Sequence, residues 1–162
     1  MSQNLIRNGN FETGDFTHWK VIPGGGTVNV IKHNNNYVAS LQCYPAAHPR
    51  VKIESKFASR AQEFTGYFSA SLPFNELPDD DQRLPLVNYQ VTVYQGESPV
   101  PVQAFTQIVL VRKNPTLFEF SFRMKEKFDR VIVSLYPTSD SAPVEWGPFC
   151  IDNIKYFEKT TS

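Results

Sequence analysis

Apolar and polar residues alternate over much of the chain, which is the pattern of β-strands with one buried face. The alternation is clearest at residues 27–32, 50–54 and 63–72, and turn residues such as the glycines at 24–26 separate the segments. The same pattern predicts further strands at residues 4–7, 37–43, 86–94, 100–111, 116–123, 130–136 and 149–157. Helical periodicity is almost absent, and residues 123–128 form the one plausible helical turn. Many short strands between turns predict an all-β fold, an antiparallel β-sandwich or barrel.

Alternation also assigns the two faces of each predicted strand, because successive side chains point to opposite sides. The apolar set, for example Val87, Tyr89 and Val91, is expected in the core. The opposite set is rich in Tyr, Asn, Gln, Ser and Thr and carries scarcely any charge. The candidate ligand-binding residues taken from this outward set are Tyr67, Asn88, Gln90, Tyr94, Gln103, Gln107 and Tyr136.

An uncharged outward face is unusual, since solvated sheet faces tend to carry charges that favour solubility and deter edge pairing. Amides and hydroxyls exchange hydrogen bonds with sugar hydroxyls, and aromatic rings stack on the apolar face of a pyranose. The face therefore indicates an oligo- or polysaccharide ligand. Two plainer interpretations stay open: a loop covers the face, or the face is simply an uncharged exterior.

Length and charge narrow the class of protein. The chain of 162 residues suits one domain, for which we expect residues 1–158, with a flexible tail at 159–162. The 16 basic and 16 acidic residues balance, so the basic surplus of a nucleic-acid-binding protein is missing. No apolar run approaches the ~20 residues that cross a bilayer, so membrane insertion is not expected. The N-terminus shows no signal segment, so either the protein is not exported by that route or a signal has been removed.

Candidate reactive residues do not assemble into a catalytic motif. The sequence has no Gly-x-Ser-x-Gly or His-Glu-x-x-His motif, and its 3 histidines lack ligand spacing. The acids at 79–81 could supply a carboxylate pair for glycoside hydrolysis, but such a run usually forms a solvated turn. Cys43 and Cys150 are either small buried apolar residues or a single disulfide between neighbouring strands. We expect a protein that is not an enzyme.

Each end of the chain carries a short sequence motif that is found in known protein families. Residues 4–14 read Asn-Leu-Ile-Arg-Asn-Gly-Asn-Phe-Glu-Thr-Gly and are followed by Trp19, while residues 150–154 read Cys-Ile-Asp-Asn-Ile. These motifs resemble the first and last strands of jelly-roll carbohydrate-binding modules of families 4, 9 and 22. The resemblance implies a galactose-binding-domain-like jelly roll, a lectin-like function without catalysis, and a core position for Trp19.

The opening motif also resembles a bacterial family of domains that lie N-terminal to tandem-repeat regions on Bacillus-type surface proteins. That resemblance implies an alternative function as a structural or attachment domain of a bacterial surface, spore or phage-related protein. Such a domain binds protein partners, forms a homo-oligomer or carries an attached repeat region. Either resemblance implies an extracellular or cell- or spore-surface location.

The resemblance to carbohydrate-binding modules further implies a structural Ca²⁺ ion. Its oxygen ligands would come from Asn10, Glu12, the carbonyl of Asn36 and Asp152. The acidic residue expected before the third strand is absent, because His33 and three asparagines occupy that stretch, and fewer carboxylates weaken the site. The alternative is that Glu12 and Asp152 cap turns or pair with a cation such as Lys155.

Overall fold

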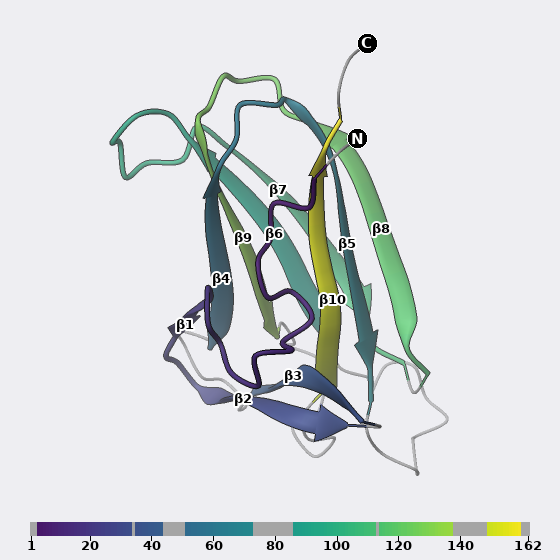
Figure 1. The fold of residues 1–162 in the computed structure, drawn as a ribbon. Helices are drawn as coiled ribbons and strands as arrows, with labels where there is room; N and C mark the ends of the chain where they lie inside the picture. The colour runs from purple at the N-terminus through teal and green to yellow at the C-terminus, as the bar shows by residue number, and fades with distance from the viewer. Residues whose placement is uncertain are drawn as a thin grey trace.

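The protein is a sandwich of two antiparallel five-stranded sheets (Figure 1). The computed structural model describes residues 3–33, 35–43, 51–72, 86–112, 114–137 and 149–159. Sheet A has the strand order β2-β3-β10-β5-β8, and sheet B has the order β1-β4-β9-β6-β7. The strands are β1 (Lys20–Ile22), β2 (Gly26–His33), β3 (Asn36–Cys43), β4 (Lys52–Ala58), β5 (Glu63–Ser71), β6 (Leu86–Tyr94), β7 (Gln103–Leu110), β8 (Thr116–Arg123), β9 (Arg130–Pro137) and β10 (Phe149–Glu158).

The strand order confirms the predicted antiparallel β-sandwich of the jelly-roll kind. Strands that follow one another along the chain repeatedly change sheet, so β4 and β6 lie in sheet B while β5 lies in sheet A. The predicted strand at residues 4–7 is reduced to an isolated bridge between Asn4 and Phe157, and the short strand β1 was not predicted. The expected helical turn at 123–128 is a bend instead. In the part of the chain that the structure describes, no helix is long and apolar enough to cross a bilayer.

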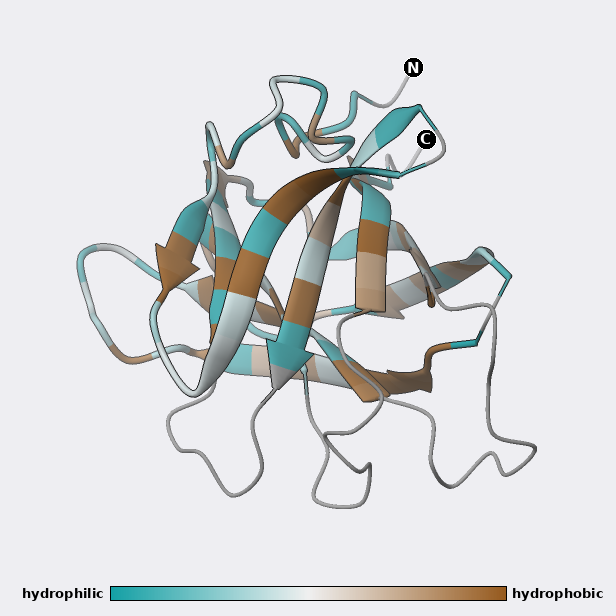
Figure 2. Ribbon diagram, turned by 90° about the horizontal axis from the view of Figure 1, so that it is seen from below, coloured by the Kyte–Doolittle hydropathy of each residue, from teal (hydrophilic) through white to brown (hydrophobic). Residues whose placement is uncertain are grey.

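The core lies between the sheets, and the largest of its fully buried side chains are aromatic. Apolar and polar residues alternate along the strands, visible as brown and teal bands in Figure 2, and the apolar set faces inward. Phe68 of β5 stacks on Tyr89 of β6 across the sandwich, with ring centroids 5.5 Å apart. Gly66 makes room for the Tyr89 hydroxyl, since a Cβ at this position would lie 2.2 Å from that oxygen. Both the Tyr89 and Tyr156 hydroxyls are buried without a hydrogen-bond partner.

The opening motif is bound to the closing motif. Residues 3–9 run between β4 and β10 (Figure 1), where the side-chain oxygen of Asn4 accepts from the backbone N–H of Ile6 and Tyr156. Further along, the Gly9 carbonyl accepts from the Ile154 N–H at 2.9 Å. A Cβ at Gly9 would lie 2.0 Å from the Ile154 carbonyl oxygen, so only glycine fits. The two motifs that bracket the sequence therefore meet beside the last strand.

Trp19 belongs to the core, as the family resemblance implied. It is 8 % exposed, its ring lies 5.8 Å from that of the fully buried Phe11, and its indole N–H donates to the Asn8 carbonyl at 2.9 Å. Because the indole is buried and its N–H is already bonded, Trp19 anchors the N-terminal loop and offers no platform for a sugar.

Candidate functional site

Four of the predicted binding residues share the outer face of sheet B. Asn88, Gln90 and Tyr94 alternate along β6 with buried core residues. Across the ladder to β9, Asn88 pairs with Tyr136, Gln90 with Ser134, and Tyr94 with Arg130. Residues paired across a ladder lie on the same face. The alternation therefore predicted the direction of these four side chains correctly.

Asn88 and Tyr136 join the inner strands β6 and β9 on this face. The Asn88 side-chain N–H donates to the Tyr136 hydroxyl at 2.7 Å, and the Asn88 Oδ1 atom is buried without a partner. Asn88 is 6 % exposed and the neighbouring Ser134 3 %, although both point away from the core. Part of this face is therefore shielded from solvent, which agrees in part with the plainer interpretation of a covered face. Gln90 and Tyr136 are half-buried and remain reachable.

Tyr94 lies at one end of the same face and is already in contact with a cation. The Arg130 guanidinium lies over the Tyr94 ring, 5.1 Å from its centroid, and also donates to the Ser98 carbonyl at 2.9 Å. One face of the Tyr94 ring is thus covered. A sugar can stack only on the other face unless Arg130 moves.

The prediction of an uncharged face is wrong where β4 joins the sheet. Glu54 pairs with Ser134 and Lys56 with Ile132, which places the charged β4 residues on the outer face beside β9. The Lys52 ammonium lies 3.3 Å from the Glu54 carboxylate, and the Glu54 side chain is 12 % exposed. The sequence could not reveal this, since alternation assigns the face within one strand but not the neighbour of that strand.

Gln103 and Gln107 lie on the other face of β7 from the one predicted, so they do not share the outer face with Asn88, although Gln107 is exposed. The register pairs them with the core residues Val93 and Tyr89. The Gln103 side-chain oxygen accepts from the backbone N–H of Lys125 at 2.8 Å and of Glu126 at 3.1 Å, which holds the bend after β8. Alternation failed here because both faces of β7, an outer strand of the sheet, mix apolar and polar residues.

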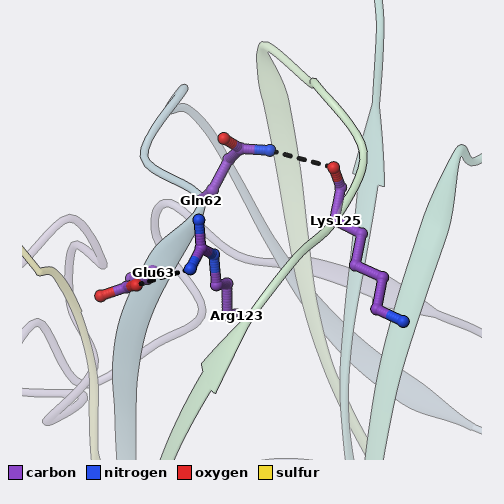
Figure 3. A network of polar contacts seen from close by, with 4 residues as sticks. All are labelled: Gln62, Glu63, Arg123 and Lys125. Atoms are coloured by element: carbon purple, nitrogen blue, oxygen red, sulfur yellow. Dashed lines mark hydrogen bonds and ion pairs between the residues drawn. The ribbon is translucent and has the colours of Figure 1, made fainter.

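The bend after β8 is also held by Gln62, which directly precedes β5. Gln62 donates its side-chain N–H to the Lys125 carbonyl at 3.2 Å, and the Arg123 guanidinium lies 3.6 Å from the Glu63 carboxylate (Figure 3). The polar side chains around this bend therefore support the connection between β8 and β9.

Tyr67 points outward as predicted but lies on the wrong sheet to join the other candidates. It belongs to β5 of sheet A, so it faces the opposite side of the sandwich from Asn88 and Tyr136. Its hydroxyl donates to the Glu119 carboxylate at 3.3 Å, and its ring meets that of Phe157 edge to face at 5.7 Å. Sheet membership could not be read from alternation, and this is why the prediction grouped Tyr67 with the others.

The four residues predicted for calcium come from the N-terminal loop and from strands β3 and β10 of sheet A. Asp152 and Asn36 line a small cavity of about 180 Å³, and Asn10 accepts from the Glu12 N–H at 3.3 Å. Burial raises the pKa of Asp152 to about 6, with an opposing hydrogen bond from the Asn153 N–H and a further increase from the charge of Glu12. This electrostatic effect links Glu12 of the N-terminal loop to Asp152 of β10.

The chemistry of this region fits a hard cation. The Asp152 Oδ1 atom is buried without a hydrogen-bond partner, and a cation would satisfy it. Within the described residues, no three His, Cys, Asp or Glu side chains form a metal cluster, so amide and carbonyl oxygens would have to complete the coordination.

Cys150 is a buried free thiol, which agrees with the interpretation of this cysteine as a small buried apolar residue, while the Cys43 side chain lies outside the described part of the chain. Cys150 is 2 % exposed and pairs with Ser40 of β3. Burial and the neighbouring charge of Asp152 raise the pKa of the thiol to about 11. The thiol is therefore protonated and unreactive in the folded protein.

The fold of this chain is similar to that of several solved structures. No family model matches the chain, and no curated protein matches it. Among solved structures, TmCBM61 in complex with β-1,4-galactotriose superposes with a TM-score of 0.67 at 17 % identity, covering 98 % of this chain and 100 % of that one. A family 4 carbohydrate-binding module gives a TM-score of 0.62 at 15 % identity, covering 95 % and 99 %. The chain has the jelly-roll fold of carbohydrate-binding modules.

A third match is a part of a larger protein. The enzymatically active domain of tailspike protein 4 from bacteriophage CBA120 has a TM-score of 0.70 at 12 % identity. The match covers 94 % of this chain, which spans about a fifth (21 %) of the tailspike chain. The jelly roll thus occurs both as a complete module and as one portion of a long chain.

Proposed function

We propose that this domain binds an oligo- or polysaccharide, without cleaving it, on the outer face of sheet B. The observation that carries the proposal is the Asn88–Tyr136 hydrogen bond, which holds an amide and an aromatic ring together on the face that Gln90 also shares. The Asn88 amide fixes the Tyr136 hydroxyl, so the ring is ordered before a ligand arrives. An ordered ring loses little conformational entropy when a sugar stacks on it.

The fold comparisons support this proposal. One matching structure is TmCBM61 in complex with β-1,4-galactotriose, and another contains the CBM22-1–GH10 modules of a xylanase from Clostridium thermocellum, complexed with xylohexaose. Hydrolysis needs two carboxyl groups that flank the glycosidic bond. On the described part of this face Glu54 is the one carboxylate, and it is paired with Lys52.

Isothermal titration calorimetry against β-1,4-galactan, xylan and β-glucan oligosaccharides tests the proposal. The variants Tyr136→Ala and Gln90→Ala should each weaken binding about tenfold or more, because a lost stacking or hydrogen-bond contact costs ~1.4 kcal/mol or more. Tyr67→Ala and Gln107→Ala are matched controls, since these residues lie outside the proposed face. Equal losses in Tyr67→Ala and Tyr136→Ala would place the ligand elsewhere.

We also propose that a structural Ca²⁺ ion binds between the N-terminal loop and β10, held by oxygens of Asn10, Glu12, Asn36 and Asp152. The buried and unpartnered Asp152 Oδ1 supports this assignment. Two carboxylates make it a weak site. The ion would tie the opening motif to the closing motif, so its function is stability rather than sugar contact. An extracellular or cell- or spore-surface location, where Ca²⁺ is plentiful, belongs to the same proposal.

A second function, attachment through protein contacts or self-association, is favoured by strand β7. None of its eight residues is charged, and β7 is an outer strand of its sheet. Ile108 on β7 is 50 % exposed, and Leu117 on the neighbouring outer strand β8 is 63 % exposed. Uncharged outer strands are prone to pair with another chain. Sedimentation equilibrium should then show a dimer or larger that Ile108→Lys converts to monomer, while a monomeric wild type argues for sugar binding alone.

A further inference from the structure

A groove of about 490 Å³ lies between the N-terminal segment and strand β4, away from the centre of the proposed sugar site. β1 pairs with β4 only opposite Lys52–Glu54, so residues 55–58 of β4 extend beyond β1. Residues 3–7 form the opposite wall, and Figure 1 shows this segment running between β4 and β10. The volume falls within the range of small-ligand sites, ~300–1,000 Å³.

Both walls are held in place by hydrogen bonds. The Leu5 N–H donates to the Tyr156 carbonyl at 2.9 Å, and Asn4 accepts from the Tyr156 N–H at 3.0 Å. The other wall belongs to β4, which is paired with β9 along its length. The groove is therefore formed before a ligand enters, which lowers the cost of binding.

The side chains of the groove are basic and rich in hydrogen-bond donors. Arg7, His18 and Lys56 line it, together with the buried Ser55, and none of the described residues that line it is acidic. Among the described residues, neither Arg7 nor Lys56 forms an ion pair. By contrast, two other openings, of about 740 and 480 Å³, combine Arg60 with acids such as Glu158, which offset its charge.

His18 has an unusual backbone conformation in the wall of the groove. Its φ is 70°, in the left-handed region, and the adjacent Trp19 is fixed by its N–H bond to the Phe16 carbonyl at 2.8 Å and by its indole bond to Asn8. Non-glycine residues in this region are uncommon, and such strain concentrates at binding sites. The loop thus holds His18 at the groove at some conformational cost.

From this arrangement we infer that the groove binds an oxyanion, the carboxylate of a sugar acid or a sulfate or phosphate group. The Arg7 guanidinium supplies a two-pronged donor, the Lys56 ammonium a compact positive charge, and the Ser55 hydroxyl a neutral donor. The inference does not depend on sugar binding at the outer face of sheet B. Lys56 also lies on that outer face, opposite Ile132, so an acidic sugar chain can reach both places.

An NMR titration of the ¹⁵N-labelled chain tests this inference. The probes are sodium sulfate, sodium phosphate and sodium glucuronate, with glucose as the neutral match for glucuronate and sodium chloride holding the ionic strength constant. At least one anion should cause saturable shifts at residues 3–7, 18 and 55–58, and glucose should cause none there. Tighter binding of glucuronate identifies a sugar acid as the ligand, and tighter binding of sulfate or phosphate identifies an ester or free oxyanion.

Charge-neutralising variants separate a site from a general charge effect. Arg7→Gln and Lys56→Gln should each weaken anion binding about tenfold. Lys155→Gln should leave it unchanged, because this exposed lysine lies opposite Tyr67 on sheet A. Unchanged spectra outside the groove show that the variants fold. Chemical-shift changes that grow linearly with anion concentration and match those in sodium chloride would overturn the inference. Equal anion affinity in all three variants would also overturn it. Neither outcome depends on whether neutral oligosaccharides bind at sheet B.

Discussion

The Asn88 side-chain N–H donates a 2.7 Å hydrogen bond to the hydroxyl of Tyr136, which fixes an amide and an aromatic ring side by side on sheet B. Tyr136→Phe removes the acceptor and leaves the buried Asn88 amide with an unsatisfied N–H. Such a loss costs about 1–3 kcal/mol. We expect the free energy of unfolding, measured by urea denaturation, to fall by that amount and sugar affinity to fall with it. Tyr94→Phe is the control and should change stability little, since its ring contact with Arg130 remains.

The Gly66–Tyr89 contact predicts a pair of coupled substitutions. Gly66→Ala places a methyl group 2.2 Å from the Tyr89 hydroxyl and should destabilise the protein by about 1–3 kcal/mol. Tyr89→Phe removes a buried hydroxyl that has no partner, so on its own it should be neutral or stabilising. The double variant should recover much of the loss caused by Gly66→Ala. Additive effects in a double-mutant cycle would contradict the contact.

Gly9 and Gly96 are suited to glycine for different structural reasons, close packing at Gly9 and a positive φ at Gly96. Gly9→Ala brings a Cβ to 2.0 Å from the Ile154 carbonyl oxygen, so the opening loop must move off β10. Gly96 has a φ of +64° and open space around it, so Gly96→Ala should cost only about 1 kcal/mol of backbone strain. Thermal denaturation should therefore show a much larger fall in Tm for Gly9→Ala. Similar melting temperatures for the two variants would mean that the loop does not depend on this contact.

The raised pKa of Asp152 predicts a pH-dependent stability. Burial raises this pKa from 3.8 to about 6, so between these values the folded chain binds more protons than the unfolded chain. The contribution of Asp152 to stability is therefore lost as the pH rises through this window when no cation is bound. In EDTA, Asp152→Asn should melt above wild type at pH 7 and close to it at pH 3.

Calcium should reverse the order of the melting temperatures of the wild type and Asp152→Asn at pH 7. A ligand bound only by the folded state raises Tm, so millimolar Ca²⁺ should stabilise the wild type at pH 7 but not Asp152→Asn. Glu126→Gln, at an exposed position, serves as a control that keeps the calcium response. Identical melting of the wild type in EDTA and in Ca²⁺ would refute the metal site.

Alternation within a strand predicted more of the fold than of the site. It placed Asn88, Gln90 and Tyr94 correctly because β6 keeps a regular apolar and polar alternation from Val87 to Val93. It failed for Gln107, because Phe105 and Ile108 put large apolar side chains on both faces of β7. An outer strand is buried less, and its pattern carries less information about direction.

Long-range pairing could not be predicted from local pattern. Nothing in the sequence around Tyr67 indicates that β5 joins β10 and β8 rather than β6, yet that pairing decides which side of the sandwich the ring faces. The same holds for Lys56, which reaches the outer face of sheet B through the pairing of β4 with β9. The basic groove was missed for this reason too, since Arg7 and Lys56 are distant in sequence.

Mapping the bound sugar by NMR tests the central proposal most directly. The ¹⁵N-labelled chain is titrated with the oligosaccharide that binds most tightly by calorimetry. The proposal predicts saturable shifts on the outer face of sheet B, at Gln90, Ser134 and Tyr136, with the outer face of sheet A unchanged. Shifts centred on Tyr67 and Glu119 of sheet A, or no saturable shift with any oligosaccharide, would contradict it.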